Sequence, residues 1–156
     1  MTAEFEALIT RHSNTIRSIA RSYCSSHELE DLTQDILMQL WRSFSRFRGD
    51  STFETWLYRI AINTAINYQR SEIKTRKGKE QSASALNITT SLDGLSHEQI
   101  LQAFINQLNQ VDRAVLMMYI DGLTSSEMAS VLGIKANAIK VRVCRLKAKF
   151  NEQFVT

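Results

Sequence analysis

The chain has 156 residues, 44% of them apolar, and a net charge of +3, which is enough apolar material for one packed domain or two small ones. Its apolar runs stay well short of the roughly eighteen residues a membrane span needs, and its start carries acids where a signal peptide carries bases. Cys24 and Cys144 show no metal-ligand spacing. We therefore expect a cytoplasmic protein with no membrane insertion, no metal site and no cofactor.

The composition favours an all-helical protein, because proline is absent and the five glycines stand mostly where helical patterns stop. The charge is unevenly distributed. Residues 1–70 hold eight bases and eight acids, whereas six bases near the C-terminus follow one another with no intervening acid: Lys135, Lys140, Arg142, Arg145, Lys147 and Lys149. Such a run has the electrostatic footprint of a nucleic-acid binder.

Two helices are predicted in the first part of the chain. Apolar residues recur at helical spacing through residues 5–22, and a second helix is expected to begin between His27 and Asp31. Its first two turns crowd polar and acidic side chains: Glu28, Glu30, Asp31, Gln34 and Asp35. Two explanations are open: the acids complement the positive end of the helix dipole and aid solubility, or they form a binding surface for a basic partner.

The segment 47–70, FRGDSTFETWLYRIAINTAINYQR, predicts a tight turn that leads into a helix. Gly49 permits the turn, and Asp50 or Ser51 is expected to cap the helix. One helix sector gathers aromatic, amide and guanidinium groups: Trp56, Arg59, Asn63, Asn67 and Arg70. This sector is either an ordinary solvated face with a tryptophan at the core boundary or a binding surface.

Residues 78–95 lack a sustained apolar period and are predicted to be a flexible linker between two small helical domains, residues 1–77 and 96–156. About eighteen residues of coil could stretch to about 60 Å, so the domains could be held well apart on one long partner. After two further helical segments, Thr124 and Glu127 form a capping-box pattern before a helix that stops at Gly133. Another helix follows within three or four residues, which is the layout of a helix-turn-helix.

The last helix of that pair separates into two faces. Its core stripe is Ile139, Val143, Leu146 and Phe150, and the opposite face carries small residues with basic edges. Such a face can enter the major groove while its edges reach phosphates on both sides. An ordinary solvated basic helix is the alternative.

Two long segments resemble the small extracytoplasmic-function (ECF, group 4) sigma factors of the bacterial sigma-70 family. The segment EDLTQDILMQLWRSFSRFRGDSTFETWLYRIAINTAINYQR resembles region 2, and LNQVDRAVLMMYIDGLTSSEMASVLGIKANAIKVRVCRLKAK is similar to region 4. Their order and separation strengthen the joint match. The resemblance implies an all-α initiation factor with region 2 in residues 1–77 and region 4 in residues 96–156.

The resemblance also implies roles for particular residues. The motif that grips the clamp helices of the largest RNA polymerase subunit is matched by Asp31, Leu32, Gln34 and Asp35. Asn63 stands where the family reads a base flipped out of the −10 element, with Trp56, Arg59 and Asn67 on the same face. Binding energy from captured bases can drive local melting without ATP.

In the second domain, the positions implied to meet the −35 duplex are Lys140, Val141, Cys144 and Arg145, and those implied to hold phosphates are Arg113, Arg142 and Lys147. The family's usual Gly-Thr-Val-[KR]-Ser opening is replaced here by residues 137–141, NAIKV. Val141 can touch a thymine methyl but cannot donate a hydrogen bond. The family's typical −35 sequence is therefore not assumed.

The expected function is that of an alternative sigma factor, which binds core RNA polymerase, directs it to promoters and helps to melt the −10 region. The expected partners are core polymerase, promoter DNA (duplex at −35, single-stranded at −10) and an anti-sigma factor, with no small-molecule substrate. One alternative is a stand-alone helix-turn-helix regulator, which would bind duplex DNA without polymerase. A nucleic-acid enzyme is the other, but the sequence lacks a metal-spaced cluster, a P-loop or a nucleophile–base pair, so no catalytic residue is predicted.

Overall fold

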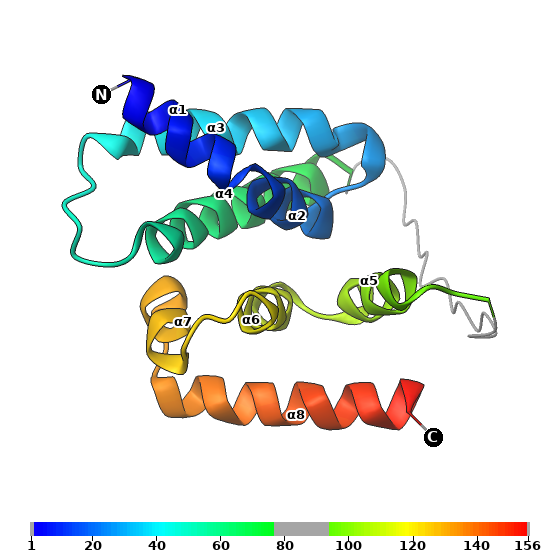
Figure 1. Ribbon diagram of the computed structural model, residues 1–156. Coiled ribbons are helices and arrows are strands. Elements are labelled where there is room, and N and C mark those ends of the chain that lie inside the picture. Colours follow the sequence, from blue (N-terminus) through cyan, green and yellow to red (C-terminus); the bar gives the residue numbers. More distant parts are fainter. Residues whose placement is uncertain (1, 77–93, 156) are drawn as a thin grey trace.

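The computed structural model describes residues 2–76 and 94–155, so the linker expected over residues 78–95 lies outside the described residues except for its last two. The described part contains α-helices, one 3-10 turn and no strand. The first unit comprises α1 (Thr2–Arg11), α2 (Ser13–Tyr23), η1 (Ser26–Glu28), α3 (Leu29–Phe44) and α4 (Phe53–Arg76). The second comprises α5 (His97–Gln107), α6 (Gln110–Ile120), α7 (Ser125–Leu132) and α8 (Ala136–Phe154). Figure 1 shows the two units as stacked layers.

The single helix expected over residues 5–22 is in fact two helices, α1 and α2, that meet at His12. Hydroxyl groups on both sides of the break bond to backbone carbonyls: Thr10 Oγ1 donates to Glu6 O (2.8 Å) and Ser13 Oγ donates to Thr10 O (3.1 Å). Side chains of this kind offer the backbone an alternative to a continuous helix. The apolar period runs on across the break and hides it.

The turn before α4 is confirmed, because Gly49 has a φ of +79°, which favours glycine. The expected cap is wrong. Thr52, rather than Asp50 or Ser51, lies next to the first helical residue, and its Oγ1 accepts a hydrogen bond from the Thr55 backbone N–H at 3.2 Å. Leu57 of α4 is fully buried and marks the side of this helix that faces the core.

The helix-turn-helix is formed by α7 and α8. The Thr124 Oγ1 atom accepts from the Glu127 N–H (3.1 Å), and Glu127 Oε1 accepts from the Thr124 N–H (2.9 Å), so the predicted capping box is confirmed. The hydrogen bond that the Glu127 carboxylate accepts from the Thr124 backbone N–H is the largest cause that lowers the pKa of Glu127. Gly133 ends α7 with a φ of +71°, and α8 starts three residues later. Ile139 and Leu146 of the predicted stripe are buried, while Val143 and Phe150 are half-buried.

The Thr124→Ala substitution is expected to destabilise the chain by about 1 kcal/mol at neutral pH, because one backbone N–H at the start of α7 loses its acceptor. Urea denaturation followed by circular dichroism measures this loss. Ser126→Ala, at an exposed position inside the same helix, is the matched control and should change stability little. Equal effects of the two substitutions would contradict the role of the cap.

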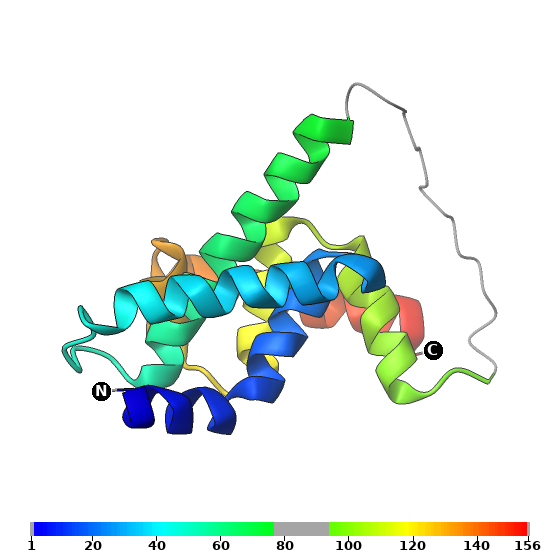
Figure 2. The same cartoon turned by 90° about the horizontal axis from the view of Figure 1, so that it is seen from above.

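The two helical units pack against each other. One contiguous buried cluster includes residues of both units, and α4 lies along α6 and α7. Figure 2 shows α4 extending beyond the body of the molecule at its C-terminal end, with α8 on the far side of the second unit. The shared core fixes how the candidate binding faces are presented.

Candidate nucleic-acid and partner surfaces

The acidic face of α3 lies open to solvent. Asp31, Gln34 and Asp35 are exposed, as a surface for a basic partner requires, and they form no ion pair with any residue in 2–76 or 94–155. Leu32, the fourth residue of the predicted motif, is fully buried. It therefore supports the helix from inside, while the other three side chains are free to meet a partner.

The same helix exposes two large apolar side chains that the sequence analysis missed. Met38 and Trp41 are 48% and 47% exposed, and with Phe5 and Ile9 of α1 they line a groove of about 530 Å³. The sequence pattern could have revealed Met38 and Trp41, because both are absent from the set of buried residues on α3. Met38 and Trp41 extend the solvent-exposed face of α3 from the acidic residues toward the C-terminal end of the helix.

Asn63 and Asn67 are exposed on α4 and line a polar groove of about 620 Å³ between α3 and α4. The other lining residues are Asp35, Met38, Gln39, Arg42, Ser43, Ile60, Thr64, Tyr68 and Ser71. Amide groups, a guanidinium and an aromatic ring thus surround one hollow. Sequence periodicity could not reveal the contribution of α3, because it relates positions within one helix only.

Trp56 and Arg59 have different surroundings, although they share the sector of Asn63. Trp56 is only 8% exposed and packs among the rings of Phe44, Phe47 and Phe53, with centroids 5.1–6.2 Å away. Arg59 Nη2 donates to the Ser130 carbonyl of α7 at 3.3 Å and to the Ser130 hydroxyl. The structure therefore joins Asn63 and Asn67 in one groove but not Trp56 and Arg59.

The outer face of α8 is accessible over most of its length. Lys140, Val141, Cys144, Arg145 and Lys147 are all exposed, with Val141 at 47%. The Lys147 ammonium lies 4.7 Å from the Tyr119 ring centroid. A small centre with basic flanks is thus presented to solvent as the sequence predicted.

Two other predicted phosphate contacts are engaged within the protein. Arg142 Nη1 pairs with Asp112 Oδ1 at 2.7 Å. Arg113 Nη1 donates to the Ser22 carbonyl of the first unit at 2.6 Å, and its guanidinium lies 5.6 Å from the Tyr23 ring centroid. Burial lowers the pKa of Arg113, and its Nε is buried without a hydrogen-bond partner. Sequence reasoning could not foresee the contacts with the first unit, because Ser22 and Tyr23 lie about ninety positions from Arg113.

The two thiols have different surroundings. Cys24 is half-buried, and its pKa is raised, first by burial and then by the charge of Glu28, while Cys144 is exposed. Within residues 2–76 and 94–155, no cluster of three His, Cys, Asp or Glu side chains is placed to hold a metal ion. None of the helices in the same ranges is both long and apolar enough to span a bilayer.

Two family models match this chain in the predicted order. Residues 8–75 match Sigma-70 region 2, and residues 98–150 match Sigma-70 region 4. Among curated proteins, the ECF RNA polymerase sigma-E factor of Escherichia coli is 27% identical, with the match covering 92% of this chain and 82% of that protein. The sigma-E factor of Haemophilus influenzae is 26% identical over 92% of this chain and 83% of its own length.

Solved structures agree over both units. The sigma factor RpoE of Bartonella quintana, in complex with the anti-sigma factor NepR, superimposes with a TM-score of 0.76 at 25% identity, covering 96% of this chain and 95% of that one. CnrH, in complex with the cytosolic domain of CnrY, shares the fold with a TM-score of 0.69 at 23% identity, over 98% of this chain and 88% of its own.

Proposed function

The chain belongs to the sigma-70 family, in its ECF group, and we propose that it binds core RNA polymerase, selects promoters through −35 and −10 elements and assists melting. The observation that carries this proposal is the pairing of an open acidic face on α3 with an open basic face on α8, each within its matching family region. Such a factor acts in the cytoplasm, where RNA polymerase is located, and it supplies binding energy rather than catalysis.

Three surfaces divide this function. Asp31, Gln34 and Asp35 meet the clamp helices of the polymerase, and their charges complement a basic partner. The groove at Asn63 and Asn67 receives a flipped −10 base, because an amide can pair with a base edge and the neighbouring Tyr68 offers an aromatic ring. The exposed face of α8 reads the −35 duplex. An anti-sigma factor is a further partner, as it is for RpoE of Bartonella quintana, which was solved with the anti-sigma factor NepR.

Run-off transcription with purified core polymerase on a genomic library tests the function directly. The expected result is a set of transcripts whose start sites share one −10 and one −35 sequence when aligned. Transcription no different from that of core polymerase alone would overturn the proposal. Tight, specific binding to duplex DNA without polymerase would instead favour the stand-alone helix-turn-helix regulator.

Arg145→Ala is expected to lower −35-dependent transcription about 10- to 100-fold, because a specific arginine–base contact is worth about 1–3 kcal/mol. Run-off assays on promoters with an intact and a scrambled −35 element measure the effect, which should vanish on the scrambled template. Glu152→Ala is the control, since this side chain is also exposed on α8 but lies outside the recognition face. An equal loss on both templates would argue against base reading by Arg145.

A further inference from the structure

An ion pair joins α8 to α6 within the second unit. Arg142 Nη1 lies 2.7 Å from Asp112 Oδ1, and the two side chains are 37% and 24% exposed. Partial burial removes part of the solvent screening that makes exposed ion pairs weak. The pair therefore links two helices more firmly than an exposed pair would, across thirty positions of the sequence.

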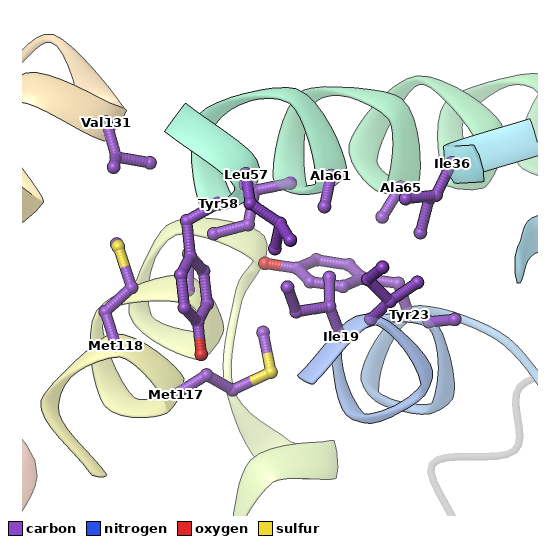
Figure 3. Close-up of a cluster of buried hydrophobic side chains, with 14 of the residues drawn as sticks. Ile19, Tyr23, Ile36, Leu57, Tyr58, Ala61, Ala65, Met117, Met118 and Val131 are labelled. Atoms are coloured by element: carbon purple, nitrogen blue, oxygen red, sulfur yellow. The ribbon is translucent and has the colours of Figure 1, made fainter. Parts of the chain in front are cut away.

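The Asp112 end of the pair has a fixed place in the first turn of α6. The Asp112 backbone N–H donates to Asn109 Oδ1 at 2.8 Å, which caps the helix, and an acid in this turn complements the positive helix end. Figure 3 shows Met117 and Met118 of the same helix among the buried side chains, where they are 6% and 0% exposed. A group that bonds to Asp112 is thus tied to a helix that is anchored in the core.

Apolar packing alone sets the rotation of α8 about its axis only loosely, because burial is non-directional. The buried residues of α8 are Ile139 and Leu146. A rotation of about 20° would move a group about 6 Å from the axis by about 2 Å, which is enough to break a hydrogen bond to a base edge. Arg142 lies about 60° around the helix from Arg145, between that residue and the core, and its bond to Asp112 is directional.

The sequence resemblance implies a phosphate contact for Arg142, but the ion pair favours a different role. A guanidinium that Asp112 already neutralises releases fewer counterions from DNA than an unpaired cation does. A phosphate at this position would also approach the Asp112 carboxylate and be repelled by it. Lys140 and Lys147 are exposed on the same helix and are better placed for phosphates.

We propose that Asp112 and Arg142 form a positioning pair for −35 recognition: the pair sets the rotation of α8 from which Arg145 reads the duplex, and Arg142 neutralises no phosphate. The inference rests on the proposed function, in which the outer face of α8 reads the −35 element. The pair itself touches no base. Its effect on recognition therefore depends on the presence of Arg145, which an effect on stability alone would not.

The Asp112→Ala substitution distinguishes the two roles of Arg142 by the direction of its effect. If the pair positions α8, the variant holoenzyme should lose about 10-fold in run-off transcription from a promoter with an intact −35 element, and little from one with a scrambled element. If Arg142 held a phosphate, the substitution would free its guanidinium and remove a repelling acid, so transcription would stay the same or rise. Glu98→Ala is the matched control, because it removes the same charge from an exposed position in the first turn of α5, and it should change neither rate.

Two further measurements separate positioning from a loss of stability. In an Arg145→Ala background, Asp112→Ala should lower transcription less than about 2-fold, because the side chain that the pair positions is gone. Arg142→Ala should show the same loss of about 10-fold, while the log–log salt slope of holoenzyme binding to the promoter changes by much less than the roughly 0.9 expected for one lost phosphate contact. Circular dichroism checks that helix content is retained in every variant.

Three results would each overturn the positioning role: unchanged or higher transcription with Asp112→Ala on the intact element, a full 10-fold loss in the Arg145→Ala background, or a salt slope reduced by about 0.9 in Arg142→Ala. The parent chain separates this failure from that of the proposed function. If transcription by the parent holoenzyme does not depend on the −35 element, the proposed −35 reading falls and the role of the pair falls with it. If the parent depends on the element and the variants behave in any of the three ways, only the role of the pair falls.

Discussion

Replacing Asp31, Gln34 and Asp35 together by alanine is expected to abolish binding to core RNA polymerase, with a loss in affinity of at least about 1,000-fold. All three side chains are exposed on consecutive turns of α3, so a partner can reach them together. Each hydrogen bond involving a charged group is worth about 1.5–3 kcal/mol, and three such losses exceed the roughly 4 kcal/mol that corresponds to 1,000-fold. Because none of the three contributes to the core, the fold should persist.

The affinity is measured by competition with a labelled sigma factor for core polymerase. The matched control is Glu4→Ala with Glu6→Ala, which removes the same two negative charges from exposed positions on α1. If net charge alone governed assembly, the control would lose as much affinity for core polymerase as the triple variant. Unchanged affinity in the triple variant would remove α3 from the polymerase interface.

Leu32 shows why a motif must be divided between surface and core. It belongs to the same predicted motif, yet it is fully buried. Leu32→Ala is expected to destabilise the fold, whereas the acidic residues on either side act through the surface. A loss of polymerase binding in that variant would therefore not report on a direct contact.

Features set by local chemistry could be predicted from the sequence. The capping box of Thr124 and Glu127 and the turn at Gly133 depend on residues a few positions apart, and the structure confirms both. The same holds for the open basic face of α8. By contrast, the apolar period continues across the break at His12 and gives no sign of it, and the cap of α4 is Thr52 rather than the expected Asp50 or Ser51.

Features set by distant pairing could not be predicted. Arg59 and Arg113 have the chemistry of phosphate contacts, but their charges alone do not show that Ser130 and Ser22 would satisfy them. Likewise Trp56 has the chemistry of a ring on which a base could stack, but in the fold it packs among three phenylalanine rings. In each case the sequence specifies the group, and the tertiary fold decides whether it is available.

Asn63→Ala is expected to lower the yield of open promoter complexes about 10- to 100-fold while leaving affinity for core polymerase unchanged. Asn63 is exposed in the polar groove between α3 and α4, where its amide can both donate to and accept from a flipped base. A good bidentate amide–base contact is worth about 1–3 kcal/mol. This energy offsets the cost of unstacking, so its loss should appear in melting rather than in polymerase binding.

Permanganate reactivity of unpaired thymines in the −10 region measures the melted fraction. Asn14→Ala, which removes an exposed amide from α2 at a distance from the groove, is the matched control. Normal reactivity in Asn63→Ala would remove this residue from base capture.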